Sequence, residues 1–271
     1  MSTLTHVVHD SATMLRRNLR HAVRYPSVSL GSALLPVMML LLFVYAFGGS
    51  IGAGIGAGIG AGTGGASAGR EAYLEYLTPG IVIMAVAAGS MATSISVCSD
   101  MTTGIINRFR TMNITRSSFM TGHVLGSVVQ TMVSVVFVVA VALAVGFRPH
   151  ANVLEWAAAA GLLTAVAFSL TWLSVALGLI SKTVESASNK PLIIQFMPFV
   201  GSAFVPADSM SPGLRWFAEF QPFTPMIETV RGLLTGSPIG QDAWIALAWC
   251  VGIGLVGYLW SRSLFDRDAH R

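Results

Sequence analysis

Few side chains in this sequence are placed to carry out covalent or metal chemistry. Neither of the two lysines, Lys182 and Lys190, follows a glycine as in a GxxxxGK[ST] phosphate-binding loop, so the chain is not expected to hydrolyse nucleotides. No HExxH pattern or paired Cys/His set marks a metal site, and Cys98 and Cys250 both fall in apolar stretches. His123 stands alone in another, where packing is favoured over catalysis. We therefore expect no catalytic residue, metal or cofactor in this chain.

The composition explains why such side chains are scarce. Of the 271 residues, 54% are hydrophobic and only 10% are charged, whereas about 25% of a soluble domain is charged. The chain therefore has too few polar groups to cover the surface of a water-soluble domain. The sequence therefore excludes an ordinary soluble enzyme or a nucleic-acid-binding module, and it predicts an all-α polytopic membrane protein.

Six apolar stretches are long enough, or nearly so, to cross a bilayer, for which a helix needs about 20 residues. The fifth stretch is short, because its length corresponds to only ~22 Å of helix against a ~30 Å hydrocarbon core. Its helix is expected to begin earlier, near Glu185. Residues 1–27 and 261–271 would then be cytoplasmic, flanking a six-helix transmembrane domain over residues 28–260. The six predicted spans are residues 28–47, 77–98, 119–147, 154–180, 191–205 and 243–260.

The basic residues predict an orientation for these spans. With both termini in the cytoplasm, 12 of the 16 lysines and arginines lie in cytoplasmic segments, as the positive-inside rule requires. The net charge of +4 is therefore a signature of topology. The span cores contain no Asp, Glu, Lys or Arg, although ion-coupled transporters place such residues inside the membrane. Uphill transport would need energy from elsewhere, and the cargo is expected to be apolar or amphipathic.

Residues 5–24 predict a basic amphipathic helix that precedes the first span. Apolar side chains recur at three- and four-residue steps, and arginines fill most of the opposite side. Such a helix lies in the membrane interface with its apolar face toward the lipid. We favour it over a plain positive flank that only fixes topology. The arginines are Arg16, Arg17, Arg20 and Arg24.

The segment 99–118, between the second and third spans, is the most polar internal stretch. Apolar and basic side chains are interleaved there at helical spacing. A short helix of this kind suits docking into a groove on a partner, and it equally suits a loop helix packed against its own bundle. The charged members are Asp100, Arg108, Arg110 and Arg116, and the apolar ones are Ile105, Ile106, Phe109 and Met112.

Two segments are expected on the outer side. Residues 51–62 repeat Ile-Gly-Ala-Gly, and because glycine disfavours helices a flexible linker is favoured over a helical extension. Residues 206–240 combine helix-breaking prolines with aromatic residues that prefer the membrane interface. Short helices that dip into the outer leaflet are favoured there over a surface loop.

Short motifs in three regions of the chain form a combined pattern. Residues 100–112 read DMTTGIINRFRTM; residues 201–206 and 210–212 read GSAFVP and MSP; residues 221–225 and 231–236 read QPFTP and RGLLTG. Together they resemble the motifs of type-2 ABC exporter permeases, especially the actinobacterial daunorubicin-resistance type. The resemblance covers most of the chain, and the repeat at 51–62 departs from it.

The resemblance implies a permease of the bacterial cytoplasmic membrane that pairs with a second permease copy, more readily as a homodimer than as a heterodimer. Its other partners would be membrane lipids and a cytoplasmic ABC ATPase dimer that holds ATP and Mg²⁺. The first cytoplasmic loop would be the ATPase-coupling helix, the N-terminal arginines would lie at the ATPase and membrane surface, and the outer segment would cap the exit path. The implied coupling residues are Asp100, Gly104, Ile105, Arg108, Phe109, Arg110 and Met112, and the implied cap residues are Pro206, Pro222, Pro225, Glu228 and Arg231.

The expected function is export of hydrophobic or amphipathic compounds, drugs or lipids, powered by a separate ATPase. The cargo would move along a groove at the dimer interface, lined by the first, second and fifth spans. Two alternatives stay open: a channel or passive scaffold subunit without an ATPase, and an intramembrane enzyme that uses His123.

Overall fold

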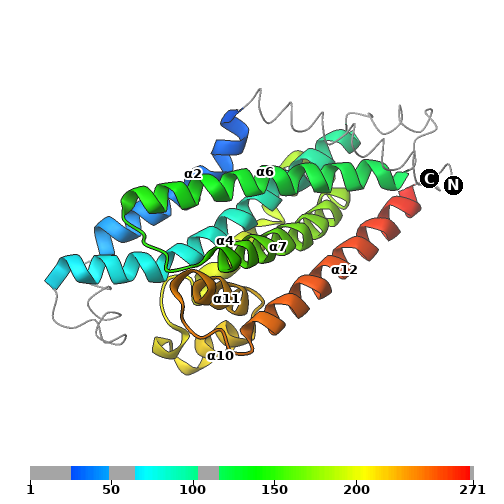
Figure 1. The fold of residues 1–271 in the computed structure, drawn as a ribbon. Coiled ribbons are helices and arrows are strands. Elements are labelled where there is room, and N and C mark those ends of the chain that lie inside the picture. Colours follow the sequence, from blue (N-terminus) through cyan, green and yellow to red (C-terminus); the bar gives the residue numbers. More distant parts are fainter. Residues whose placement is uncertain (1–25, 49–64, 103–115, 269–271) are drawn as a thin grey trace.

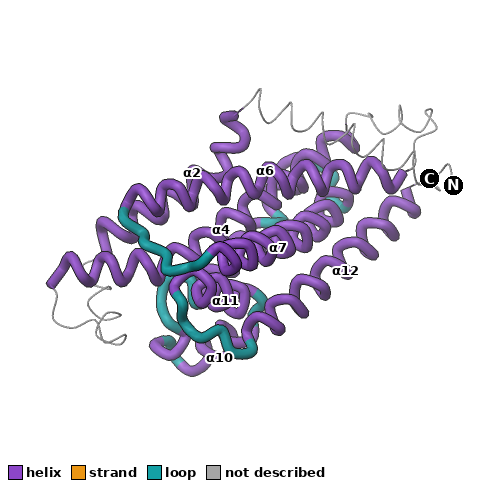
Figure 2. Tube along the Cα trace, in the orientation of Figure 1, coloured by secondary structure: helices purple, strands orange, loops and turns teal. Residues whose placement is uncertain are grey.

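The computed structural model describes residues 26–48, 65–102 and 116–268, and these form a bundle of helices without strands (Figures 1 and 2). The prediction of an all-α fold is confirmed. In chain order the elements are α2 (Pro26–Leu42), the π-helix η1 (Phe43–Phe47), α4 (Gly65–Thr102), α6 (Arg116–Val145), α7 (Val153–Leu179), α8 (Val184–Asn189), α9 (Leu192–Phe196), the 3₁₀ turns η2 (Met197–Val200) and η3 (Ala207–Ser209), α10 (Pro212–Phe220), α11 (Phe223–Thr235) and α12 (Asp242–Asp268).

Four of these helices contain stretches that are long and apolar enough to cross a membrane, which supports a polytopic membrane protein. The stretches are Gly69–Thr102, Thr121–Val145, Val153–Leu179 and Asp242–Leu264, and a shorter apolar helix covers Gly31–Phe47. Within an apolar 18-residue window of each stretch, 78% of the positions are buried in the first and only 17% in the last. α4 is therefore the central helix, and α12 lies at the periphery.

The helix that contains the second predicted span begins before that span. The hydropathy pattern places its start at residue 77, whereas α4 begins at Gly65. Residues 70–76 include charged and tyrosine side chains that lower hydropathy, yet most of these types are compatible with a helix. The helix therefore continues beyond its apolar part.

The region of the fifth predicted span is not one continuous helix. Thr183 caps α8, its hydroxyl accepting from the Ser186 N–H at 3.2 Å. Pro191 then separates α8 from α9, and Pro198 lies in η2. Because proline lacks an N–H and clashes with the preceding turn, these residues interrupt the helix. Residues 184–200 consequently form three short helical pieces.

The long helices pack closely where one of them carries a glycine. A Cβ added at Gly89 of α4 would lie 2.4 Å from Thr131 Oγ1 of α6, and one added at Gly257 of α12 would lie 2.6 Å from the Leu173 nitrogen of α7. Small residues of this kind let membrane helices approach and gain van der Waals contact. Both interfaces therefore depend on the missing side chain.

The bundle has two distinct ends (Figure 1). At the Asp100 end lie the last turn of α4, the beginning of α6 and the last turns of α7 and α12. At the Arg231 end lie α10, α11 and the start of α12. The α6–α7 connection belongs to the same end, since the His150 N–H donates to the Leu234 carbonyl at 3.0 Å.

Gly80 provides a test of the packing between α4 and the irregular segment that follows η2. A Cβ at Gly80 would lie 2.7 Å from the Ala203 Cα, so Gly80→Ala must displace backbone, at a cost of about 1–3 kcal/mol. Gly161 of α7 has nothing within 4 Å of such a Cβ. We expect Gly80→Ala to lower the midpoint of thermal unfolding, followed by tryptophan fluorescence in detergent. Gly161→Ala is the control and should not lower it; equal midpoints for both variants would contradict this packing.

Candidate functional site

A buried arginine organises the Arg231 end. The side chain of Arg231, in α11, is 7% exposed. Its Nη2 donates to the Tyr76 carbonyl at 3.1 Å and to the Ser202 carbonyl at 2.9 Å, and its Nη1 pairs with the Glu228 carboxylate. The guanidinium carbon lies 3.8 Å from the centre of the Tyr76 ring. A buried charge needs such a full set of partners because leaving water is costly.

Tyr76 completes this cluster from α4. Its hydroxyl donates to the Ser202 carbonyl at 2.9 Å, so that carbonyl accepts from both Tyr76 and Arg231. Ser202 lies outside the helices, in the turn after η2, where no helical N–H is available to its carbonyl. The Arg231 cluster, defined as Tyr76, Ser202, Glu228 and Arg231, therefore ties three separate segments of the chain together.

A second contact holds the same turn against the start of α11. With its amide oriented to satisfy both groups, Gln221 accepts from the Gly201 N–H at 2.8 Å and donates to the Met197 carbonyl at 3.0 Å. A Cβ at Gly201 would lie 2.2 Å from the Gln221 amide, so a side chain at Gly201 would displace that amide. The predicted GSAFVP and QPFTP motifs thus meet in space.

The predicted cap residues lie on the elements around this cluster. Pro206 precedes η3, Pro222 caps α11, and Pro225 occupies the first turn of α11, where a proline needs no helical donor. Glu228 and Arg231 are one turn apart and form the ion pair of the cluster. The structure therefore confirms short helices between residues 206 and 240.

α10 has one apolar and one charged side. Trp216 and Phe220 are 63% and 64% exposed, whereas Arg215 bridges Glu219 at 2.7 Å and Asp208 at 2.6 Å. The hydrogen-bonded Glu219 carboxylate, assisted by Asp208, raises the pKa of the Arg215 guanidinium above its ordinary value. Exposed aromatic rings beside paired charges are typical of a helix at a membrane interface.

At the Asp100 end, a close contact between Asp100 and His123 joins α4 to α6. His123 Nε2 lies 2.9 Å from Asp100 Oδ2, and the two side chains are 10% and 16% exposed, respectively. The sequence pattern singled out both residues but did not pair them, since 22 positions separate them along the chain. The pair closes the base of the segment that connects the two helices.

α8 and the turn that precedes it pack against the same end of α4. Ser94 Oγ donates to the Ala187 carbonyl of α8 at 3.0 Å, and Cys98 Sγ contacts the Ser181 carbonyl of the turn at 3.4 Å. Lys190 Nζ, just after α8, donates to the Ile180 carbonyl at the end of α7 at 3.0 Å. α6, the α7–α8 turn and α8 thus all contact the Asp100 end of α4.

Most of the predicted coupling and interface residues lie outside the described part of the chain. Of the coupling set, the structure describes Asp100 at the flank of the segment. Among the described residues, no group of three or more His, Cys, Asp or Glu could hold a metal ion. The predicted residues outside the described ranges are Arg16, Arg17, Arg20, Arg24, Gly104, Ile105, Arg108, Phe109, Arg110 and Met112, as is the repeat at 51–62.

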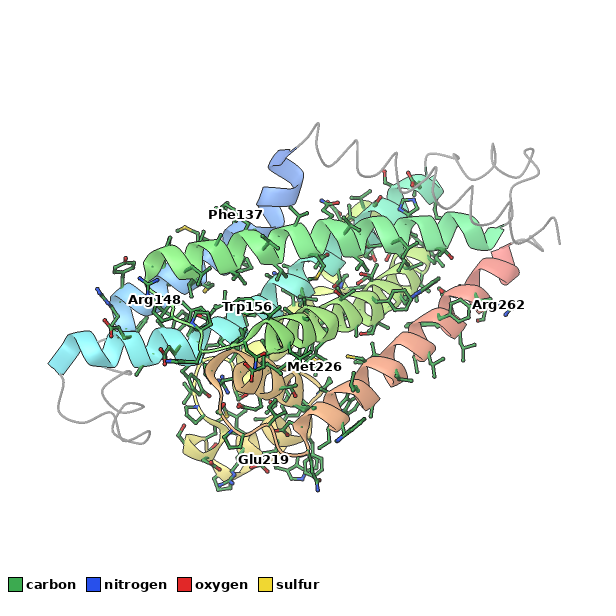
Figure 3. All side chains as sticks on the ribbon, viewed as in Figure 1. Phe137, Arg148, Trp156, Glu219, Met226 and Arg262 are labelled. Carbon is green, nitrogen blue, oxygen red and sulfur yellow. The ribbon has the colours of Figure 1, made fainter. Side chains whose placement is uncertain are left out.

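In Figure 3, Arg262 of α12 lies at the Asp100 end, whereas Arg148 and Glu219 lie at the Arg231 end. The sequence offered one signal for the cluster, because an arginine within a semi-apolar segment needs a buried partner. It offered none for Tyr76, whose role depends on how α4 packs.

Comparison with known proteins agrees with this arrangement. The sequence pattern of the ABC-2 type transporter family matches residues 10–235. A curated relative, the daunorubicin resistance ABC transporter permease protein DrrB1 of Streptomyces coeruleorubidus, is 26% identical over 267 residues, which cover 97% of this chain and 88% of that protein. The resemblance to type-2 ABC exporter permeases is thereby confirmed. The chain therefore belongs to the ABC-2 type transporter family and is the transmembrane subunit of an ABC exporter, a transport subunit rather than an enzyme.

Proposed function

We propose that this chain exports hydrophobic or amphipathic drugs, as a six-span permease that dimerises and is driven by an ABC ATPase bound at the Asp100 end. The observation that carries the cargo class is the similarity, over 97% of the chain, to a permease named for daunorubicin resistance. The span cores support it, because they offer no charged lining for an ionic cargo.

Six membrane crossings are supported by two further segments besides the four long apolar helices. The 17 residues of α2 and the five of η1 follow one another without a break and would span about 33 Å. The segment from α8 to the turn after η2 also extends along the bundle: Ala187 contacts Ser94, and Ser202 contacts Tyr76. Along α4, those two contact points are about 27 Å apart, close to the ~30 Å hydrocarbon core.

The Asp100 end is the cytoplasmic side in this proposal. Basic residues collect there, on the α7–α8 turn and on the last turns of α12, whereas acidic residues collect at the Arg231 end. The positive-inside rule favours this orientation. With six crossings, both termini would lie in the cytoplasm. The membrane would be the bacterial inner membrane, as the family resemblance implies.

Coupling would run through α4. The contact between Asp100 and His123 joins the two helices on either side of the segment 103–115, which would dock into the ATPase through Gly104, Ile105, Arg108, Phe109, Arg110 and Met112. The N-terminal arginines (Arg16, Arg17, Arg20, Arg24) would lie at the same surface. Movement of the docked segment would shift α4, the most buried span, and therefore the Arg231 cluster at its other end.

The cap would close the exit at the outer leaflet. Exposed rings on α10 favour an interfacial position, and the irregular turn after η2 is covered by α4 and α11, as backbone at membrane depth must be. Pro206, Pro222, Pro225, Glu228 and Arg231 would shape this cap. A groove lined by the first, second and fifth spans of two identical copies would carry the cargo.

The coupling role is tested by a double substitution, Arg108→Glu with Phe109→Ala. We expect loss of ATP-driven daunorubicin uptake into inside-out vesicles, because the variant lacks both the apolar ring of Phe109 and the positive charge of Arg108 that would dock into the ATPase. Membrane insertion should be unchanged. Arg262→Glu, a charge reversal on an exposed residue at the same end, is the matched control and should retain uptake. Unchanged uptake by the double variant at equal expression would contradict the coupling role.

The alternative function, a channel or passive scaffold subunit, is distinguished by purification. An exporter subunit should bring an ATPase chain with it in mild detergent, and daunorubicin should stimulate the ATPase activity of that complex. Absence of an ATPase in several detergents would favour the channel.

The Arg231 cluster predicts a stability pattern. Arg231→Met should lower the free energy of unfolding by about 3–5 kcal/mol, because Glu228 is left as an unpaired, largely buried charge. Adding Glu228→Gln should recover part of that loss, since it removes the unpaired charge. Thermal unfolding in detergent measures both effects. Arg215→Met, at the exposed ion pairs of α10, is the control with no measurable loss. An Arg231→Met variant as stable as the control would show that the cluster is unimportant.

A further inference from the structure

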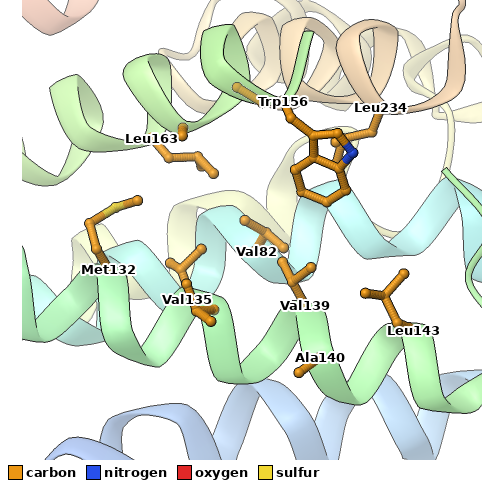
Figure 4. Close-up of a pocket in the computed structure, with 12 residues that line it drawn as sticks. Val82, Met132, Val135, Val139, Ala140, Leu143, Trp156, Leu163 and Leu234 are labelled. Carbon is orange, nitrogen blue, oxygen red and sulfur yellow. The ribbon is translucent and has the colours of Figure 1, made fainter. Parts of the chain in front are cut away.

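An apolar cavity lies between α6 and α7, away from the proposed cargo groove. Its volume is ≈ 310 Å³, and its walls come mainly from these two helices, with Val82 of α4 and Leu234 of α11 completing the lining (Figure 4). The only polar side-chain atom in the lining is the Trp156 nitrogen, which in Figure 4 lies on the side of the ring away from Met132 and Leu163. The lining of this α6–α7 cavity, as far as the described chain forms it, is therefore almost entirely apolar.

The cavity opens on the outside of the bundle. Val136 and Leu143, on its α6 wall, are 65% and 38% exposed, and Ala160 on the α7 wall is exposed, whereas Val82 and Ala159 are buried. Both walls belong to helices that are long and apolar enough to cross a membrane, so this surface faces lipid in a bilayer. Apolar cavities of about half this volume stay dry and bind benzene-sized molecules. The fitting ligand is therefore a hydrocarbon rather than water.

A cation stands just beyond the cavity. Arg148 follows the last turn of α6, is exposed, and forms no ion pair with any other described residue. It comes five positions after Leu143 of the cavity wall. Trp156, on the facing wall, is a residue type that prefers the boundary between lipid tails and headgroups. A hydrocarbon slot, a tryptophan of the interfacial type and an exposed cation that forms no ion pair with another described residue match the parts of an anionic lipid.

We propose that the α6–α7 cavity binds one acyl chain of an anionic glycerophospholipid, with its phosphate beside Arg148. The bound lipid is a structural ligand and not the exported cargo, because the cavity is lined by α6 and α7 and shares only Val82 with the spans of the proposed groove. Its chain contacts Leu234, three residues beyond Arg231. Lipid binding would therefore stabilise α11, the helix that carries Glu228 and Arg231 of the cluster.

Photolabelling in vesicles tests the site without ATP or drug. The protein is reconstituted in phosphatidylcholine with a trace of phosphatidylglycerol that carries a diazirine on one acyl chain, and labelled peptides are mapped by mass spectrometry. We expect labelling at the cavity walls to exceed that at equally exposed positions on α12, such as Val251 and Leu255. Even labelling of α6, α7 and α12 would overturn the proposal.

Matched alanine-to-phenylalanine substitutions distinguish binding in the cavity from labelling of the surrounding surface. Ala160→Phe places a ring in the cavity and should lower labelling of its walls several-fold, whereas Ala158→Phe, exposed on the same helix but outside the lining, should leave it unchanged. Ala140→Phe reaches the cavity from the α6 side and repeats the test if Ala160→Phe does not fold. Equal labelling in the cavity-filling and control variants would refute a bound chain.

The headgroup contact has its own readout. Arg148→Gln should lower the preference of the site for labelled phosphatidylglycerol over labelled phosphatidylcholine by up to about fivefold, the upper end for an exposed pair of opposite charges. An unchanged preference would remove Arg148 from the site. Displacement of the labelled chain by daunorubicin at transport concentrations would show a cargo site instead and would also overturn the proposal.

Discussion

Backbone that leaves the helical pattern inside a membrane must find hydrogen-bond partners within the protein, and this constraint shapes the Arg231 end. Prolines interrupt the helix between residues 184 and 200, and the turn that follows leaves the carbonyl group of the buried Ser202 without a partner inside a helix. Tyr76 and Arg231 both donate to the Ser202 carbonyl. The buried arginine is in turn tolerable because two carbonyls, a carboxylate and an aromatic ring surround it. The broken helix and the buried charge therefore stabilise each other.

α4 connects this cluster to the opposite end of the bundle. It carries Tyr76 near its start and Asp100 in its last turn, and most of the residues between them are buried. Because close-packed interiors transmit strain, we expect a displacement at the Asp100 end to reach the other end through α4. The peripheral α12 has few buried positions.

Hydropathy and the placement of proline were sufficient to predict the fold class, the long apolar helices and the short helices near residue 212. They did not predict the early start of α4, since residues 70–76 are polar but remain helical. Nor did they pair Asp100 with His123 or Arg231 with Tyr76, because such pairs depend on how helices distant in sequence pack. Of the candidate sites, Glu228 and Arg231 were the most accessible from sequence, as residues three apart share a helix face.

The interruption of the fifth apolar segment has a consequence for biogenesis. A translocating chain releases a helix into lipid when that helix satisfies its own backbone and is long enough to cross, and the pieces over residues 184–200 are too short to do so alone. In the folded protein their carbonyl groups accept from other segments: Ser94 of α4 donates to Ala187, and Gln221 donates to Met197. Because α4 precedes these pieces along the chain, it has already been synthesised when they emerge.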